Sequence, residues 1–177
     1  MKRVLCILET GFEEIELVTP VDLLRRAGVE VVMASLSCAT VTGKSGIQIR
    51  SNCRLGVLNE NDFDALLLPG GPAVMELRKS SPVLEVIRDF HQAKKWIAAI
   101  CAAPLLLKDA GVIDGRKYTA HFSTAKELPG SSGERLEKDR CLLTSRGAGT
   151  ALEFGLALVE ILEGKAVAEE ISAAVMA

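Results

Sequence analysis

The chain has 177 residues, of which 49 % are hydrophobic and 25 % are charged. This composition excludes a mainly disordered protein and predicts one domain over residues 1–177, with enough apolar residues for one sizeable core. Lysine and arginine number 21 against 23 acidic residues, so the basic surplus of a dedicated nucleic-acid or anionic-membrane binder is missing. No apolar run reaches ~18 residues, and the first one is too short for an export signal, so we expect a cytoplasmic protein without a membrane span.

The five cysteines show neither C-x-x-C spacing nor the regular framework of a secreted disulfide scaffold. Cys6 and Cys141 lie in apolar runs, where we expect inert, buried thiols. Cys38 and Cys53 fall in an irregular segment, where they are expected to be exposed and open to oxidation, without signs of activation. With two histidines and no H-E-x-x-H motif, we expect no metal site and no cofactor.

Short β-branched runs alternate with helical segments, a pattern typical of parallel strands joined by crossover helices. It predicts strands over residues 4–8, 29–34, 65–68, 96–100, 118–122 and 141–144, and helices over 13–27, 81–93, 102–110 and 150–163. Residues 38–62 are predicted to form a small hairpin or two short strands. Ser81-Pro82 predicts a capped helix start, and Thr150-x-x-Glu153 predicts a capping box. The expected architecture is a three-layer α/β sandwich that binds ligands at the carboxyl ends of its strands.

Cys101 is the strongest candidate for chemistry, because it falls between a predicted strand, WIAAI, and a predicted helix. A thiol at a helix N-terminus faces free N–H groups, which favour the nucleophilic thiolate and can stabilise an oxyanion. The alternative is a small buried hydrophobic residue at a strand end.

The loop LLLPGGPA places Gly70 and Gly71 at another carboxyl end of the sheet, either for close backbone approach to a ligand or for a tight turn. Glu13 and Glu14 open the first helix, where we expect solvated side chains that complement the helix dipole. Glu16 lies among apolar neighbours. Its carboxyl is either pressed toward the site and held protonated or on a solvated face.

His121 ends the segment KYTAH. It is a candidate base beside Cys101, although a histidine at a strand end is also often a hydrogen-bonded structural residue. His91 lies in a polar pattern and is assigned to a solvated helix face.

Together these segments resemble the ThiJ/PfpI superfamily, in the branch of the human parkinsonism-associated deglycase and bacterial YajL. The resemblance is carried by GFEEIELVTPVDLLRRAGVEV, DALLLPGG, AAICAAP, TAHFSTAK and LLTSRGAGTALEFGLALVEIL. These stretches follow one another in family order, and only about residues 38–62 and 127–138 fall outside them.

The resemblance implies a flavodoxin-like sandwich with a mostly parallel central sheet, and a homodimer. It implies that Cys101 is the reactive, easily oxidised cysteine, that Glu16 hydrogen-bonds it in protonated form, and that His121 lies beside it. It further implies that the N–H groups of Gly71 and Ala102 act as oxyanion donors.

Two departures from the family pattern matter. The proteolytic branch has a histidine directly after the cysteine, where this chain has Ala102, which argues against a peptidase. Of two arginines near the site in the human protein, Arg26 matches one, a possible anion contact, and the other falls on Gly46.

The activity implied is that of a glutathione-independent glyoxalase and deglycase that acts on methylglyoxal, glyoxal and their adducts with proteins or nucleotides. The alternative is a redox sensor or chaperone without physiological turnover, which needs only an oxidisable thiolate stabilised by Glu16. Thiamine-precursor synthesis is disfavoured, because no phosphate-cradling P-loop is present.

Overall fold

The structure is a computed structural model that describes residues 1–37 and 39–177, so the prediction for Cys38 lies outside the described residues. A seven-stranded sheet has the strand order β5-β2-β1-β6-β7-β9-β8 and is parallel except for the pairing of β8 with β9. Its strands are β1 (Arg3–Leu8), β2 (Glu30–Ser35), β5 (Cys53–Arg54), β6 (Ala65–Leu68), β7 (Trp96–Ile100), β8 (Leu136–Asp139) and β9 (Leu142–Ser145). A separate antiparallel hairpin, β3 (Thr40–Thr42) and β4 (Gln48–Arg50), confirms the hairpin predicted within residues 38–62.

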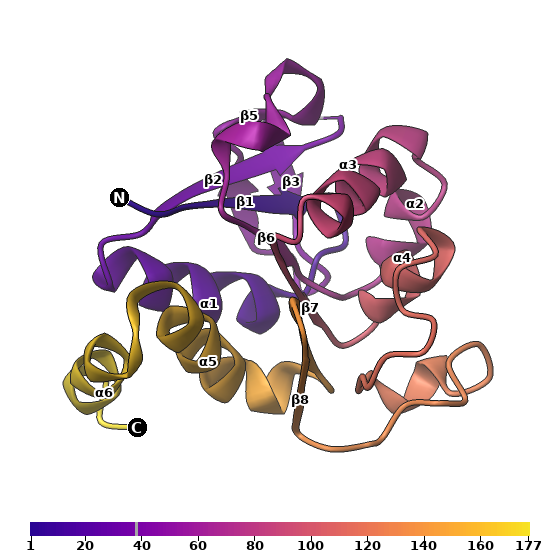
Figure 1. Ribbon diagram of the computed structural model, residues 1–177. Helices are drawn as coiled ribbons and strands as arrows, with labels where there is room; N and C mark the ends of the chain where they lie inside the picture. The colour runs from indigo at the N-terminus through magenta and orange to yellow at the C-terminus, as the bar shows by residue number, and fades with distance from the viewer. Residues whose placement is uncertain (38) are drawn as a thin grey trace.

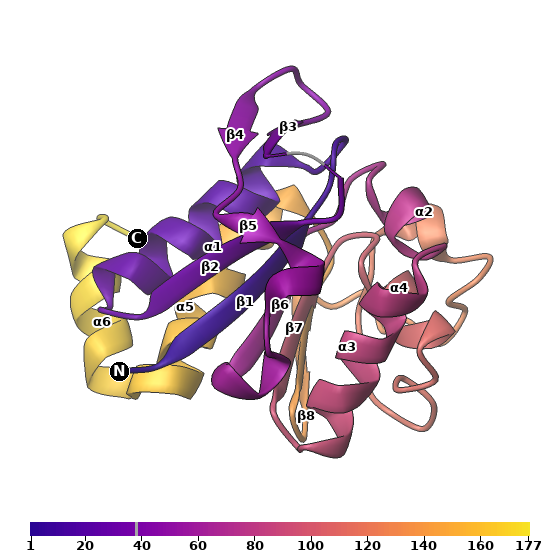
Figure 2. The ribbon, with the colours of Figure 1, turned by 90° about the horizontal axis from the view of Figure 1, so that it is seen from above.

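Helices cover both faces of the sheet, as Figures 1 and 2 show. One layer contains α1 (Glu14–Arg26), α5 (Ala151–Glu163) and α6 (Lys165–Ala174), and the other contains α2 (Val74–Leu77), α3 (Ser81–Gln92) and α4 (Pro104–Asp109). Strand β1 is buried on both faces: Leu5 and Ile7 pack in the core under α3 and α4, and Val4, Cys6 and Leu8 pack in the core under α1 and α5. The predicted three-layer α/β sandwich is thereby confirmed. No helix in the described part is long and apolar enough to cross a bilayer.

The predicted strand over residues 118–122 is wrong. This segment is irregular and continues into a 3₁₀ turn at Phe122–Thr124. Its N–H groups bond outside any ladder: the N–H of Thr119 donates to Thr144 Oγ1 (3.0 Å) and that of Ala120 to Ser131 Oγ (2.9 Å). These side-chain oxygens accept the hydrogen bonds that the backbone carbonyls of a neighbouring strand would otherwise accept.

Two predicted helix caps are also wrong. Thr150 precedes α5, but its hydroxyl donates to the carbonyl of Gly147 (2.8 Å) and makes no cap bond, while Glu153 pairs with Arg135 (2.8 Å). Helix α3 begins at Ser81, but its N-cap residue is Ser80 rather than Ser81, and no side chain makes a cap bond there. The helices α5 and α3 form nevertheless, because their apolar faces are buried against the sheet.

The cysteines outside the site differ in environment. Cys6 is fully buried in β1, as predicted. Cys141 is only partly buried and lies one residue before β9, with its thiol 3.1 Å from the carbonyl of Lys94, so the prediction of a buried filler is wrong for it. Cys53 is partly buried in β5, where burial raises its pKa.

The parallel strands β1, β6 and β7 are neighbours and run in the same direction. Their carboxyl ends therefore meet at one edge of the sheet, where the loops after them place Phe12, Gly70 and Cys101. The candidate site lies at this edge.

Candidate active site

Cys101 occupies a sharp elbow between β7 and α4. Its backbone φ is +64°, a left-handed conformation that is uncommon for a residue other than glycine. Two backbone bonds hold it: its N–H donates to the carbonyl of Ser145 (2.8 Å), and its carbonyl accepts from the N–H of His121 (2.8 Å). Helix α4 begins three residues later, at Pro104, and not at Ala102 as the sequence predicts. The strained backbone at Cys101 indicates a functional position.

The loop after β6 brings backbone donors to the thiol. The N–H groups of Gly71 and Ala102 both bond the sulfur of Cys101, and both lower its pKa. Gly71 has a φ of +90°, and a Cβ there would lie 2.6 Å from the carbonyl oxygen of Gly11. A Cβ on Gly70 would lie 2.5 Å from Glu16 Oε2 and 2.7 Å from the Cβ of Cys101. The loop after β6 can therefore lie this close to Glu16, Cys101 and Gly11 only with glycine at both positions.

Glu16 is the buried carboxyl of the site, with a side chain that is 1 % exposed. Its Oε2 accepts from the N–H of Gly70 (3.0 Å), and its carboxyl hydrogen-bonds Cys101. Burial raises the pKa of Glu16 to about 7, mainly because the ionised form loses its hydration. Of the two alternatives left open by the sequence, the structure selects the buried carboxyl that faces the cysteine.

Glu13 and Glu14 are buried, contrary to the prediction of solvated side chains. Glu13 caps α1, because its carboxylate accepts from the N–H of Glu16 (2.8 Å), and it lies 3.9 Å from Lys44 Nζ. Glu14 accepts from the N–H of Ser45 (2.7 Å) in the β3–β4 turn. The hairpin folds over the start of α1 and covers both carboxylates, a long-range contact with no local signal in the sequence.

Charge couples Cys101 to Glu16. Burial and the carboxylate of Glu16 raise the pKa of the Cys101 thiol to about 12, and the N–H groups of Gly71 and Ala102 oppose this shift. The sequence-based prediction that the helix N-terminus by itself favours the thiolate is therefore wrong, because the pKa of Cys101 is raised and not lowered. When Glu16 carries a proton, its negative charge disappears and its O–H can donate to the sulfur. Protonation of Glu16 thus favours the thiolate.

The site opens into a cleft of about 530 Å³. Its walls include Glu13, Glu16, Lys44, Gly71, Pro72, Met75, Cys101, Ala102, Leu105, His121, Ser123, Thr124, Lys126, Glu127 and Ala148. The cleft is large enough for a small organic substrate, and it places such a substrate against the thiol and the carboxyl.

His121 lines the cleft, but its backbone rather than its ring bonds to Cys101. The ring Nδ1 lies 2.8 Å from Ser123 Oγ and also accepts from the N–H of Ser123 (3.3 Å). Because Ser123 occupies Nδ1, Nε2 is the ring nitrogen left to exchange a proton with a bound molecule.

Arg26 lies outside the cleft. It is exposed in the last turn of α1 and pairs with Asp22 (2.7 Å). Ten residues of helix separate it from Glu16, a rise of ~15 Å, so the possible anion contact is not made within this chain. Gly46, the position of the second arginine, lies in the β3–β4 turn with a φ of +92°. The cationic side chains of the cleft are instead Lys44 and Lys126, which sequence reasoning missed.

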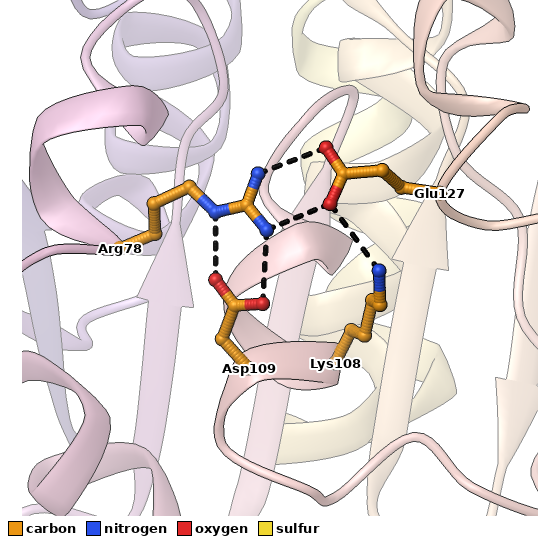
Figure 3. A network of polar contacts seen from close by, with 4 residues as sticks. All are labelled: Arg78, Lys108, Asp109 and Glu127. Carbon is orange, nitrogen blue, oxygen red and sulfur yellow. Dashed lines mark hydrogen bonds and ion pairs between the residues drawn. The ribbon is translucent and has the colours of Figure 1, made fainter.

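A charged network fixes the outer wall of the cleft (Figure 3). The guanidinium of Arg78 makes two bonds to Asp109 (2.7 and 2.9 Å) and two to Glu127 (3.0 and 2.8 Å), and Lys108 adds a contact to Glu127 (3.2 Å). Arg78 lowers the pKa of Glu127, a residue of the cleft wall. The network ties the segment after His121 to α2 and α4.

Comparison with known proteins identifies the lineage. A model of the DJ-1/PfpI family matches residues 2–161. The chain belongs to the DJ-1/PfpI family. The Parkinson disease protein 7 homolog of Danio rerio is 37 % identical over 185 residues, with 97 % of this chain and 95 % of the relative covered. Deglycase PfpI of Pyrococcus furiosus is 31 % identical over 137 residues, with 77 % of this chain and 82 % of the relative covered.

Solved structures of DJ-1/PfpI proteins share the fold over almost the full chain. Drosophila melanogaster DJ-1beta superimposes with a TM-score of 0.94 at 35 % identity and covers 99 % of this chain and 97 % of its own. Toxoplasma gondii DJ-1, in an oxidized form, gives a TM-score of 0.93 at 31 % identity over 99 % and 98 % of the two chains. The family predicted from the ordered motifs is confirmed.

Proposed function

We propose that this protein is a glutathione-independent glyoxalase and deglycase that uses Cys101 as its nucleophile. One observation supports this proposal most strongly: the Cys101 thiol, the buried carboxyl of Glu16 and the N–H groups of Gly71 and Ala102 meet at one cleft. Relatives named as deglycases at 31 % and 36 % identity support hydrolytic chemistry. The substrates we propose are methylglyoxal and glyoxal, free or bound to proteins and nucleotides.

The reactive form is the state in which Cys101 and Glu16 hold one proton between them. The pair loses its first proton near pH 7, at the raised pKa of Glu16. The pKa of Cys101, raised to about 12, keeps the remaining proton mainly on the sulfur, and the reactive form is the tautomer in which that proton has moved to Glu16. With the remaining proton on the carboxyl, the sulfur is a thiolate that accepts hydrogen bonds from Glu16, Gly71 and Ala102. This state combines a nucleophile and an acid at neutral pH.

The reaction begins when the thiolate attacks the aldehyde carbon of methylglyoxal. The aldehyde oxygen takes the proton of Glu16, which gives a neutral hemithioacetal and a carboxylate. The carboxylate removes the C1 proton, and return of a proton to C2, with His121 Nε2 moving the hydroxyl proton, gives a thioester of lactate. Water hydrolyses the thioester, releases lactate and one proton, and restores the thiolate and protonated Glu16. Donors beside the sulfur stabilise the transient oxyanions.

The test is lactate formation from methylglyoxal without glutathione. Cys101→Ser and Glu16→Ala are each expected to abolish turnover. Cys141→Ser, which alters a partly buried thiol outside the cleft, should retain it. Retention of most activity in either of the first two variants would refute the assigned roles.

A second function, redox sensing, is favoured by the same donors around the sulfur and by the relative solved in an oxidized form. A sulfinate at Cys101 would accept from Glu16 and the two N–H groups. After mild peroxide, a gain of ~32 Da, two oxygen atoms, should fall chiefly on Cys101. Oxidation spread over Cys38 and Cys53 would count against this function.

We also propose that the chain forms a homodimer. Ile15 and Val18 on α1 and Ile47 in the hairpin are each about half exposed. An apolar surface of this kind is typical of an interface between subunits. Val18→Lys should lower the sedimenting mass, and a monomeric wild-type protein would contradict the proposal.

A further inference from the structure

A second pocket, of about 660 Å³, adjoins the cleft. His121 and Ala148 line both spaces, so a molecule with one end at Cys101 can extend into the second pocket. The remaining walls come from the segment after α4, which includes Phe122, Leu128, Pro129 and Arg135, and from the loop between β9 and α5, which includes Arg146. Neither motif analysis nor the proposed chemistry at Cys101 accounts for this pocket.

The charges of the two spaces differ. Among the described residues that line the second pocket, Arg135 and Arg146 are charged and none is acidic. The cleft, by contrast, contains the carboxyls of Glu13, Glu16 and Glu127. The second pocket is therefore the more electropositive of the two.

The two arginines are not equivalent. Arg135 pairs with Glu153 (2.8 Å). Arg146 is exposed, donates from Nη1 to the carbonyl of Gly133 (3.1 Å), and forms no ion pair within residues 1–37 and 39–177. A guanidinium has five N–H donors, so Arg146 keeps donors that suit a carboxylate or phosphate.

One wall presents an aromatic face. The side chain of Phe122 is 83 % exposed, and its ring centroid lies 4.1 Å from that of His121. An aromatic side chain this exposed is costly to leave in water and suits the planar or apolar part of a ligand. Leu128 and Pro129 add apolar lining.

We propose that this pocket binds the anionic part of a substrate larger than methylglyoxal. Such a substrate carries a carboxylate or phosphate that pairs with Arg146, an apolar or planar body against Phe122, and a carbonyl-derived group that reaches Cys101. The inference rests on the proposed function for the reacting end, but binding of the anionic end does not depend on turnover. Methylglyoxal fills only a small part of the two connected spaces, which is consistent with a longer natural substrate.

Binding is tested on the Cys101→Ser protein with phenyl phosphate, phenylacetate and, as the neutral probe, benzyl alcohol, at constant ionic strength. Calorimetry should show that both anions bind and that Arg146→Met weakens both about 10-fold or more, because a charge-assisted hydrogen bond is lost. Arg50→Met, at an exposed arginine of β4 outside the pocket, should change neither affinity. Equal affinities in the Arg146 and Arg50 variants, or binding of benzyl alcohol as tight as that of the anions, would overturn the proposal.

Turnover by the protein with Cys101 intact separates this inference from the proposed function. The larger test substrate is carboxyphenylglyoxal, an oxoaldehyde whose ring carries a carboxylate opposite the reacting group. Arg146→Met should weaken its apparent binding about 10-fold, seen as a higher KM, and leave the kinetics of methylglyoxal unchanged. Equal effects on both substrates would overturn the subsite. If no oxoaldehyde is turned over while the anions still bind through Arg146, the proposed function fails and the anion pocket stands.

The aromatic contact has a test of its own. Phe122→Ser, at an exposed side chain, should weaken the binding of phenylacetate more than that of acetate, because only phenylacetate has a ring to pack on Phe122. An equal loss for the two anions would contradict the aromatic contact.

Discussion

Replacing Glu16 by glutamine tests whether a buried carboxyl holds a proton near neutral pH. Glutamine keeps the size of the side chain and an oxygen that can accept from the N–H of Gly70, but it cannot ionise. The folded protein raises the pKa of Glu16 from 4.5 to about 7. The folded state therefore binds this proton more tightly than the unfolded chain does.

The sign of the pH effect follows from that difference. The contribution of Glu16 to the free energy of unfolding is fully present below pH 4.5 and is lost as the pH rises through about 7. At about 1.36 kcal/mol for each pKa unit, the total loss is about 3 kcal/mol. Most of it, about 2.5 kcal/mol, falls between pH 5 and pH 8.

Urea unfolding of wild type and Glu16→Gln at several pH values between 5 and 8 measures this loss. The free energy of unfolding of the variant, minus that of wild type, should rise by about 2.5 kcal/mol across the range. Glu76→Gln removes an exposed acid paired with Lys79, and its pH dependence should follow wild type. A difference between Glu16→Gln and wild type that stays flat from pH 5 to 8 would refute the assignment of the proton to Glu16.

Three further predictions concern the same region. Gly70→Ala should lower the free energy of unfolding in urea by about 1–3 kcal/mol, because the added methyl group meets Glu16 and Cys101. Gly56→Ala, in open space, should change it little, and equal losses in the two variants would contradict the close fit. Arg78→Met should lower the free energy of unfolding by about 3 kcal/mol, because it leaves the carboxylate of Asp109 unpaired. Lys79→Met, at an exposed ion pair, should lower it by less than about 1 kcal/mol, and equal melting temperatures of the two variants would refute the role of the network. Cys6, fully buried, should resist alkylation in the folded protein and react only after unfolding; rapid native modification would show that β1 opens.

The features best predicted from the sequence are those determined by local hydrophobic periodicity and by the glycine and proline residues that end each segment. The strands at 4–8, 65–68 and 96–100 are continuous apolar runs, and they form the centre of the sheet. Since neighbouring parallel strands present their carboxyl ends at one edge, the same pattern brings Gly70, Gly71 and Cys101 together. Glu16 needed the fold, because its burial depends on the loop after β6.

The errors have a common physical cause: long-range contacts decided the outcome. Residues 118–122 include strand-forming residues, but the hydroxyls of Thr144 and Ser131 accept from the N–H groups of Thr119 and Ala120 in place of a ladder. Thr150 and Glu153 match a capping box, but bonds to Gly147 and Arg135 displace it. No local pattern announces such partners.

Helix α6 and strand β8 were not predicted at all. Helix α6 packs on α5, and β8 pairs antiparallel with β9 at the edge of the sheet. Both elements are short and partly exposed. Their stability therefore comes mainly from packing on α5 and pairing with β9, and little of it is reflected in their own hydrophobic periodicity.

The most direct measurement of the central claim is the rate of alkylation of Cys101 by iodoacetamide as a function of pH, resolved by mass spectrometry of the cysteine peptides. If the state of the pair with one proton includes the tautomer with a thiolate and a protonated Glu16, the rate in wild type rises through pH about 7 as that state forms and then levels, and this step is absent in Glu16→Gln. A rate that shows no step near neutrality and climbs only in strongly alkaline solution, alike in both proteins, would contradict the account.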